Sequence, residues 1–267
     1  MKITFLGTSH GIAEKNRFCS SAAVTVNGRH YVIDAGAPLM TLLQNYDMAF
    51  TDVQGIFITH THGDHNSGLV ELTLQLNVFP HFKHVHFPVY VPDERKYRAM
   101  MDFLEVEEYL EGRLLCHVYE DSDGTTKTKE GFGGRLWYQV YGDGVIFDDG
   151  TLKVTAIPVK HIPNAHCFML EAEGKRVFFT GDLRGDLSDF PKEICDLHSD
   201  LVVMEAAHCR LIEEKTSAIL KQSNTEHMII THRYLAQNPD GELELFKNSM
   251  SDRFSVEGAY DGMILEI

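Results

Sequence analysis

The segment THTHGDH, residues 59–65, holds four side chains of the kinds that bind metal ions. His60, His62, Asp64 and His65 lie close together and directly follow the apolar run GIFI, which has the pattern of a short buried strand. Imidazole nitrogens and carboxylate oxygens without a thiolate suit Zn²⁺, and they also accept Mn²⁺ or Fe²⁺. The spacing therefore predicts a metal centre at the carboxyl end of a strand.

The four side chains of this motif divide into two pairs. Alternate residues of an extended segment point the same way, so we expect His60 and His62 to face one ion. Gly63 permits a sharp turn, which directs Asp64 and His65 towards a second ion. The motif therefore predicts two adjacent divalent metal ions, each with a position left for water, as in hydrolytic metal sites.

Later strand ends supply the remaining ligands. His161 follows the strand pattern AIPVK and completes a three-histidine set for the first ion, and His232 follows HMIIT and completes the second set. Asp182 ends the pattern FFTGD, and its two carboxylate oxygens can bridge both ions. His166 is a rival to His161, but only His161 follows its strand directly.

The elements that would position these ligands alternate between strand and helix patterns, with a hairpin turn at Asn27-Gly28. We expect strands or hairpins at 1–6, 21–36, 55–59, 83–92, 151–161, 167–182, 200–206 and 227–232. We expect helices at 37–50, 67–79 (capped by Ser67), 93–113, and over about fifteen residues between 206 and 227. Strands that deliver ligands at their carboxyl ends are typical of layered α/β folds. We predict one domain over 1–267, with a lid or specificity insert within 93–150.

Composition predicts an acidic globular protein. Of the 267 residues, 43% are hydrophobic and 24% are charged, and the formal net charge is −15 at pH 7. This charge repels phosphate backbones at long range and weighs against structured nucleic acid as a partner. Metal ions would add positive charge at the site itself.

Membrane and disulfide signals are weak in this sequence. No apolar run approaches the roughly 18 residues of a membrane helix, so we expect no membrane partner. The start, MKITFLGTSHGIAEK, is typical of a first strand rather than a signal peptide. The 5 cysteines are odd in number and form no CxxC pair, which favours free thiols and a cytoplasmic location.

Taken in order, LGT, VIDAG, THTHGDH, VKH, FFTGD and ITH resemble the motifs of metallo-β-lactamase-fold hydrolases over nearly the whole chain. The resemblance implies an α/β fold, a four-layer αββα sandwich with a dinuclear site. It implies that His60, His62 and His161 hold one metal ion. It implies that Asp64, His65 and His232 hold a second ion, and that Asp182 binds both. It also implies that Asp34, beneath the site, orients a ligand histidine.

Other segments resemble the ribonuclease Z and phosphodiesterase branch of that superfamily. These are RFCSS at 17–21, TGDLR and the pair Glu205-Ala206. In that branch such a glutamate pairs with a histidine that protonates the leaving oxygen, which implies a role for Glu205 with His208. The chain departs from ribonuclease Z in having THRYLAQ at its last ligand and in lacking the PTxxR element and the basic arm for tRNA.

These observations predict a hydrolase in which a metal-bound hydroxide attacks a small-molecule substrate. The substrate class that the sequence favours is a small phosphodiester. We expect Asp64, Glu205 and His208 to be the catalytic side chains, with Asp64 also a ligand. A thioester, lactone or other carboxylic ester is the alternative substrate on the same ions. A non-catalytic metal-binding module is the alternative outside enzymes, and the sequence leaves the oligomeric state open, with a homodimer among the options.

Overall fold

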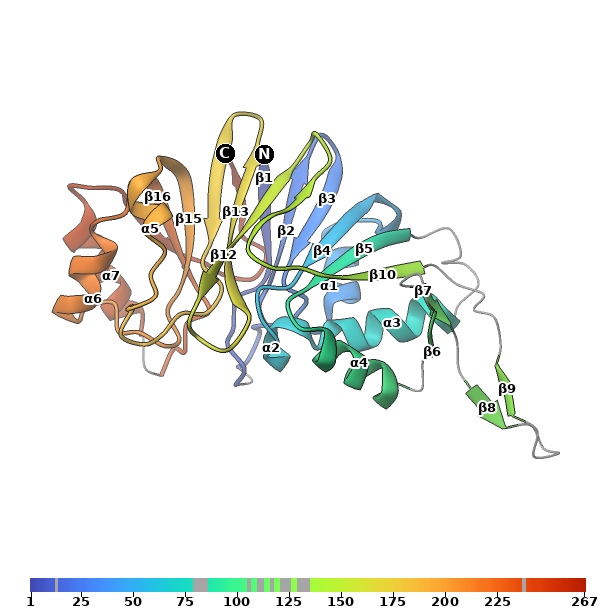
Figure 1. Ribbon diagram of the computed structural model, residues 1–267. Helices are drawn as coiled ribbons and strands as arrows, with labels where there is room; N and C mark the ends of the chain where they lie inside the picture. Colours follow the sequence, from blue (N-terminus) through green and yellow to red (C-terminus); the bar gives the residue numbers. More distant parts are fainter. Residues whose placement is uncertain are drawn as a thin grey trace.

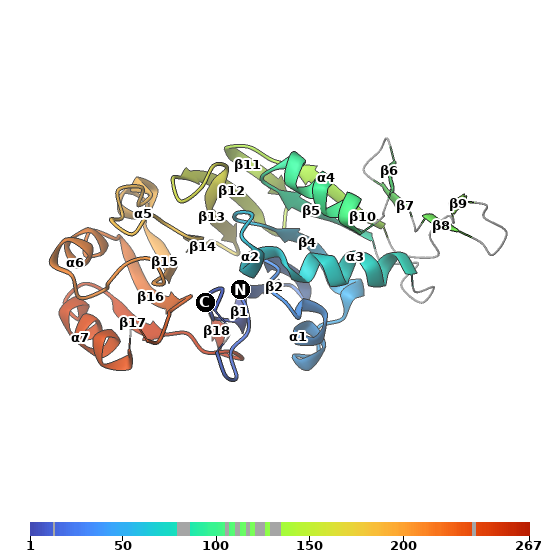
Figure 2. The same ribbon diagram turned by 90° about the horizontal axis from the view of Figure 1, so that it is seen from below.

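The computed structural model describes residues 1–12, 14–78, 86–104, 107–109, 113–115, 118–120, 126–128, 135–236 and 239–267. These residues form two seven-stranded sheets that lie face to face, with helices on the outer side of each (Figure 1). In Figure 2, the short helix α2 (Gly63–Asn66) lies between the two groups of helices. The predicted four-layer αββα sandwich is therefore confirmed.

The first sheet comes from the amino-terminal part of the chain and one carboxy-terminal strand. Its order is β10 (Arg135–Val140), β5 (His86–Val91), β4 (Val53–Phe57), β3 (Arg29–Ile33), β2 (Ser21–Val26), β1 (Lys2–Gly7) and β18 (Ile264–Glu266). Strands β3, β4, β5 and β10 are parallel to one another, and β18, β1, β2 and β3 pair antiparallel.

The second sheet comes from the later part of the chain. Its order is β11 (Gly144–Asp148), β12 (Lys153–Val159), β13 (Ala165–Ala172), β14 (Lys175–Phe179), β15 (Ser199–Glu205), β16 (Thr225–Thr231) and β17 (Ser255–Gly258). Strands β11 to β14 pair antiparallel, whereas β14 to β17 are parallel. Two small hairpins pair β6 (Glu107–Tyr109) with β7 (Arg113–Leu115) and β8 (Val118–Glu120) with β9 (Thr126–Thr128).

The helices cover the outer faces of the two sheets. They are α1 (Leu39–Asn45), α3 (Gly68–Val78) and α4 (Glu94–Phe103) beside the first sheet, and α5 (Lys192–Asp196), α6 (Glu214–Leu220) and α7 (Asp240–Met250) beside the second, with a 3₁₀ turn at Phe50–Asp52. Among the described residues, no helix is long and apolar enough to span a lipid bilayer.

Alternation along the strands builds three apolar layers. Ile56 of β4 packs on the helices beside the first sheet, while its neighbour Phe57 packs between the sheets. Val202 and Val203 of β15 divide in the same way between the second helical layer and the space between the sheets. All four are at most 3% exposed. Because side chains of a strand alternate between faces, strands with apolar residues on both faces must be covered on both sides.

The predicted strands are found near their expected positions, but several helices differ. The helix predicted at 93–113 ends at Phe103, and Glu107–Tyr109 forms a strand instead. The acidic run that follows Leu104 places like charges close together, which disfavours a continued helix. The helix expected between 206 and 227 covers only Glu214–Leu220.

The segment 63–79 also differs from the prediction. Gly63–Asn66 forms a helical turn rather than loop, and α3 follows from Gly68. The predicted capping by Ser67 is not seen, since Ser67 has a helical backbone at the end of α2 and its hydroxyl accepts a hydrogen bond from the Ala37 amide at 3.2 Å. The prediction of one domain with a lid within 93–150 stays a prediction, and 105–106, 110–112, 116–117, 121–125 and 129–134 of that segment lie outside the described residues.

Candidate metal centre

The first group of predicted ligands gathers where the two sheets meet. His60 and His62 follow β4 of the first sheet, and His161 follows β12 of the second. The His161 Nε2 and His62 Nδ1 atoms are 3.2 Å apart. One ligand atom from each of these three histidines and from Asp182 lies within 4.8 Å of all the others. The structure thus brings together residues that are far apart in the sequence.

The second group lies beside the first. Asp64 and His65 belong to α2, which begins at Gly63, and His232 follows β16 of the second sheet. The Asp64 Oδ2 atom is 3.8 Å from His65 Nε2 and 3.6 Å from His232 Nε2. These three residues form a further set of closely spaced donor atoms, which again joins the two sheets.

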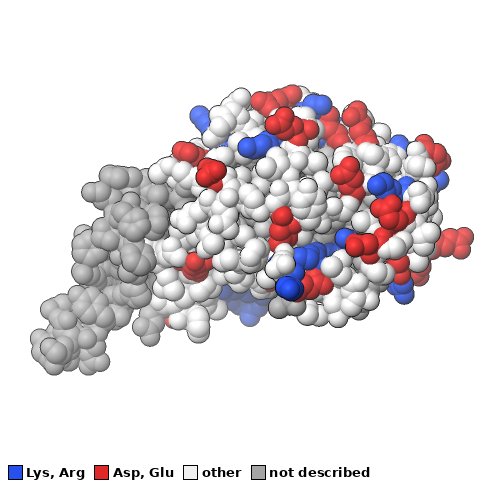
Figure 3. Space-filling model, turned by 180° about the vertical axis from the view of Figure 1, so that it is seen from behind, with Lys and Arg blue, Asp and Glu red and all other residues white. Residues whose placement is uncertain are grey.

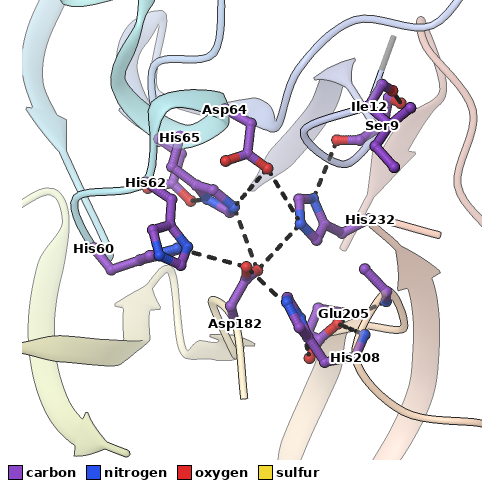
Figure 4. A network of polar contacts seen from close by, with 12 residues as sticks. Ser9, Ile12, His60, His62, Asp64, His65, Asp182, Glu205, His208 and His232 are labelled. Carbon is purple, nitrogen blue, oxygen red and sulfur yellow. Dashed lines mark hydrogen bonds and ion pairs between the residues drawn. The ribbon is translucent and has the colours of Figure 1, made fainter. Parts of the chain in front are cut away.

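Asp182 lies between the two groups (Figure 4). Its Oδ1 is 3.3 Å from His65 Nε2 and 3.4 Å from His232 Nε2. Its Oδ2 is 3.5 Å from His60 Nε2 and 3.7 Å from His161 Nε2. Each carboxylate oxygen therefore faces a different group of histidines.

The backbone before Asp182 explains its placement. Gly181 has a φ of +58°, and a Cβ atom there would lie 2.8 Å from the His166 carbonyl oxygen. A residue with a side chain would meet both strain and a clash at this position. Glycine thus lets the chain leave β14 at the angle that points the Asp182 carboxylate into the site.

Asp34 lies beneath the site, as the resemblance implied. Its Oδ1 accepts hydrogen bonds from the amide and hydroxyl of Thr59 at 2.8 and 2.9 Å. Its Oδ2 lies 2.7 Å from His65 Nδ1, so the His65 ring donates from Nδ1 and keeps Nε2 directed at Asp182. Asp34 is 4% exposed, and these bonds satisfy its buried carboxylate.

Burial and neighbouring charge shift the pKa values of the central groups. Burial, followed by charge on His65, holds the pKa of His60 well below its usual range. Burial also opposes the charged form of His65, but Asp182 and Asp34 outweigh it and hold the His65 pKa well above its usual range. Burial opposes the charge of Asp182 too, yet His232 and His65 hold the Asp182 pKa well below its usual range. The centre therefore keeps an ionised carboxylate among imidazoles.

The donor set fits bound divalent cations. Among the described residues, the buried atoms His60 Nε2, His65 Nε2 and Asp182 Oδ1 have no hydrogen-bond partner. Unpaired buried polar atoms cost free energy, so a cluster of them is expected to have a further partner. Nitrogen and oxygen donors in groups of three and four are the usual coordination sets of such ions.

Glu205 and His208 lie at the edge of the same centre. The Glu205 carboxylate accepts hydrogen bonds from the amides of Leu183, Ala207 and His208 at 3.1, 2.7 and 3.2 Å, and its Oε1 is 3.3 Å from His208 Nδ1. The hydrogen bond that His208 donates to the Glu205 carboxylate is the main cause that raises the His208 pKa to about 9. The His208 side chain is 35% exposed, so it can meet a molecule that enters from solvent.

His166, the alternative to His161 in the sequence, does not belong to either group of ligands. His166 turns away from the centre, since its Nε2 lies 3.0 Å from Asp143 Oδ1 and its Nδ1 lies 3.1 Å from the Asn164 carbonyl.

Two backbone carbonyls orient ligand histidines. The Leu183 carbonyl accepts from His161 Nδ1 at 3.2 Å, and the Ser9 carbonyl accepts from His232 Nδ1 at 3.1 Å. No sequence signal could have identified these carbonyls, because every residue has one.

Comparison with known proteins supports the resemblance. Ribonuclease Z of Synechococcus sp. (strain CC9311) is 28% identical over 192 residues, which cover 70% of this chain and 54% of that protein. The chain spans about half the length of the curated relatives it matches. The predicted similarity to the ribonuclease Z branch is therefore confirmed.

Solved structures show the same fold. The metallo-β-lactamase fold protein YhfI from Bacillus subtilis matches with a TM-score of 0.73 at 15% identity, over 99% of this chain and 98% of that chain. Zn²⁺-bound PqqB from Methylobacterium extorquens matches with a TM-score of 0.64 at 16% identity, over 100% of both chains. The fold is thus the metallo-β-lactamase fold.

The family of the chain follows from a match over most of its length. A sequence model of the family described as "Anti-Pycsar protein Apyc1" matches residues 1–222, which include every predicted ligand except His232. The chain therefore belongs to the anti-Pycsar protein Apyc1 family.

Proposed function

We propose that this protein is a metal-dependent hydrolase with a dinuclear site, and that its substrate is a small phosphodiester. The observation that carries the proposal is the position of Asp182, whose two oxygens each face a separate group of histidines. A carboxylate in this position suits two adjacent cations better than one.

The proposed ligands divide as the geometry suggests. One cation would be held by His60, His62 and His161, a second by Asp64, His65 and His232, and both by Asp182. Two divalent ions would supply an activated water molecule at neutral pH and neutralise charge on the oxygens of the reacting group. Zn²⁺, which PqqB binds, is our first choice for both, with Mn²⁺ and Fe²⁺ as alternatives.

Residues of the chain would do the remaining work. Asp34 holds the His65 ring in one orientation, which keeps Nε2 available as a ligand. Glu205 engages Nδ1 of His208, so the other ring nitrogen is left to protonate the leaving oxygen of the substrate. A partly exposed His208 suits this role because it can reach a substrate at the mouth of the site.

The substrate class rests on the comparisons and on charge. A ribonuclease cleaves phosphodiester bonds, and ribonuclease Z is the relative found most consistently. On the described part of the face shown in Figure 3, acidic and basic side chains are interspersed rather than gathered into a basic surface. With a formal charge of −15, the chain suits a small phosphodiester better than structured RNA. We propose that hydrolysis of a small phosphodiester is how this protein performs the anti-Pycsar role that the name of its family describes.

The test is hydrolysis of bis(p-nitrophenyl) phosphate by the Zn²⁺-loaded protein, with metal content measured on the same sample. We expect turnover that falls at least about 100-fold in Asp64→Ala, because the variant loses a proposed ligand. Asp252→Ala is the matched control, since this surface aspartate pairs only with Lys221 at 3.1 Å among the contacts described. Linear and cyclic nucleotides form the next panel.

A negative result also has a clear meaning. If the protein binds two ions and cleaves no phosphodiester, the substrate proposal is wrong, and thioesters and lactones become the class to test on the same ions. If the protein binds ions and turns over none of these substrates, a non-catalytic metal-binding role replaces the enzyme proposal.

A further inference from the structure

His232 depends on its surroundings for its conformation. Its φ is +53°, in the left-handed region that residues with side chains rarely adopt. Its Nδ1 donates to the Ser9 carbonyl at 3.1 Å, which directs Nε2 towards Asp64 and Asp182 (Figure 4). His232 does not fix its own backbone conformation or ring orientation. Other contacts must therefore hold the segment that contains Ser9 against the segment that contains His232.

Arg17 makes those contacts on both sides of the His232–Ser9 hydrogen bond. Its Nη2 donates to the Thr8 carbonyl at 2.6 Å, directly before Ser9. Its Nη1 donates to the Arg233 carbonyl at 3.0 Å, directly after His232. One planar guanidinium thus joins Thr8, the residue before Ser9, to Arg233, the residue after His232. This geometry suits arginine and not lysine.

Glu14 strengthens the same junction. Its Oε2 pairs with Arg17 and lies 3.3 Å from the Ser9 hydroxyl, and its Oε1 accepts from the Leu235 amide at 3.3 Å. The side chains of Arg17 and Glu14 are only 13% and 16% exposed. Partial burial makes this pair less screened by solvent than an ordinary surface ion pair.

Asp261 fixes the loop from the other side. Its Oδ1 accepts from the Thr8 amide at 2.9 Å and from the Thr8 hydroxyl at 2.6 Å. Its Oδ2 accepts from the Phe18 amide at 2.6 Å, and Phe18 in turn accepts from the Ser9 amide at 2.9 Å. Asp261 therefore holds both ends of the loop that carries the Ser9 carbonyl.

We infer that Arg17 is a positioning residue for His232, and through it sets the affinity of the Asp64–His65–His232 group for its cation. Asp261 supports Arg17 in this role. The inference rests on the proposed two-metal function. The first group has separate supports, since His161 donates to the Leu183 carbonyl. Within the described part of the chain, the hydrogen bonds of Arg17 go to Thr8, Glu14 and Arg233 and not to that group. Loss of Arg17 is therefore expected to lower the affinity for the cation of the Asp64–His65–His232 group and to leave the affinity for the other cation unchanged.

The experiment titrates metal-free protein with Zn²⁺ against a chromophoric chelator and fits two stepwise dissociation constants. For Arg17→Ala we expect one of the two constants, that of the Asp64–His65–His232 group, to rise about 10-fold, up to the roughly 100-fold seen when a direct partner of a ligand histidine is lost. We expect the other constant, that of the His60–His62–His161 group, to change by less than about twofold, because Arg17 makes no hydrogen bond with that group among the residues described. Arg17→Lys should give an intermediate value, because a single ammonium nitrogen does not reproduce the two planar nitrogens that Arg17 places on the Thr8 and Arg233 carbonyls.

Two further variants make the result specific. Asp261→Asn tests the loop without touching Arg17 and should weaken the same constant, which also covers the case in which Arg17→Ala fails to fold. Arg29→Ala is the matched control, because Arg29 is 49% exposed and pairs with Asp149 at 3.4 Å, on residues that take no part in the two groups of ligands. Nitrogen-15 spectra of the histidine rings supply a second readout, in which His232 should lose its single Nδ1–H form in Arg17→Ala.

The outcomes separate this inference from the proposed function. A wild-type protein that binds fewer than two ions rejects the proposed function and the inference with it. A wild-type protein that binds two ions, together with an Arg17→Ala variant that keeps both constants or weakens both equally, rejects the inference alone.

Discussion

Two histidines five positions apart, His161 and His166, illustrate how side-chain orientation selects a ligand. Both are buried or partly buried near the end of the same hairpin. His161 lies 3.2 Å from His62, whereas both nitrogens of His166 are engaged by Asp143 and the Asn164 carbonyl. His166 thus has a structural role, in which it holds the loop that contains Asp143.

Substitution at these two positions should therefore have different effects. We expect His161→Ala to lose most of the affinity for one Zn²⁺, because the variant removes one of the proposed nitrogen donors. His166→Gln should keep both ions and lose only about 1 kcal/mol of stability, the usual contribution of a hydrogen bond. Metal analysis and urea unfolding of both variants are the measurements, and full metal content in His161→Ala would contradict the assignment.

The seven proposed ligands could be predicted from residue type and spacing, and the structure brings all seven together. Their hydrogen-bond partners could be predicted only in part. Asp34 could be identified because it lies in VIDAG, one of the motifs that carry the family resemblance, whereas no motif marks the carbonyls of Leu183 and Ser9. Backbone partners depend on where the chain passes, which residue types do not encode.

At the scale of elements, the end of β1 shows how tightly a loop can be held against a strand. A Cβ atom at Gly7 would lie 2.0 Å from the Cys19 carbonyl oxygen. The loop that carries Ser9 and Arg17 runs between these two residues. Only glycine allows the loop to close this tightly, so Gly7 has a role in the second group of ligands without contacting it.

Gly7→Ala should destabilise the protein, because the new methyl group can be accommodated only by a shift of backbone. We expect a loss of about 1–3 kcal/mol in urea unfolding, as for other overpacked sites. Gly142→Ala is the control, since a Cβ atom there would meet nothing within 4 Å. Equal stability of the two variants would show that the loop can move away from β1 at little cost.

Strands were predicted more accurately than helices in this chain. A buried strand carries its own signal in a short apolar run, as in GIFI before His60. The helix expected at 93–113 failed because its pattern continued past the last turn that packs on the sheet, where Met101 and Leu104 are buried. Helices of this length depend on packing for their stability, and sequence alone does not show where the packing ends.

At the scale of the whole molecule, Tyr31 ties the two sheets together. Tyr31 of β3 donates to Asp149, in the turn between β11 and β12, at 2.7 Å. Burial, followed by this hydrogen bond, raises the pKa of Tyr31 to about 12. Burial alone would raise the pKa of Asp149, but hydrogen bonds, including those from the Leu152 amide and from Tyr31, hold it below its ordinary 3.8.

These shifts predict two pH windows for the stability of the protein. The Asp149 contribution is present above the ordinary pKa of 3.8 and is lost as pH falls through the lower folded value. The Tyr31 contribution is present below the unfolded value of 10.0 and is lost as pH rises through about 12. Tyr31→Phe should be less stable by about 1.5 kcal/mol at pH 7, the contribution of a hydrogen bond to a charged acceptor.

Urea unfolding from pH 3 to 12 would check this prediction. The difference between wild type and Tyr31→Phe should be constant at neutral pH and shrink towards both ends of the range. A difference that does not depend on pH would show that the hydroxyl contributes through packing rather than through its bond to Asp149.

Each group of ligands joins the segment that follows β4 of the first sheet to a segment that follows a strand of the second sheet, and this has a consequence for folding. An ion held by His62 and His161 would join positions 99 residues apart in the sequence, and one held by His65 and His232 would close a still larger loop. Such ions would act as reversible cross-links, comparable to disulfides that restrict the unfolded chain. A disulfide depends on the redox state of its surroundings, whereas these cross-links would depend on the supply of free cation. The protein would then be more resistant to unfolding and proteolysis where that ion is abundant, and would lose this resistance as the ion is withdrawn.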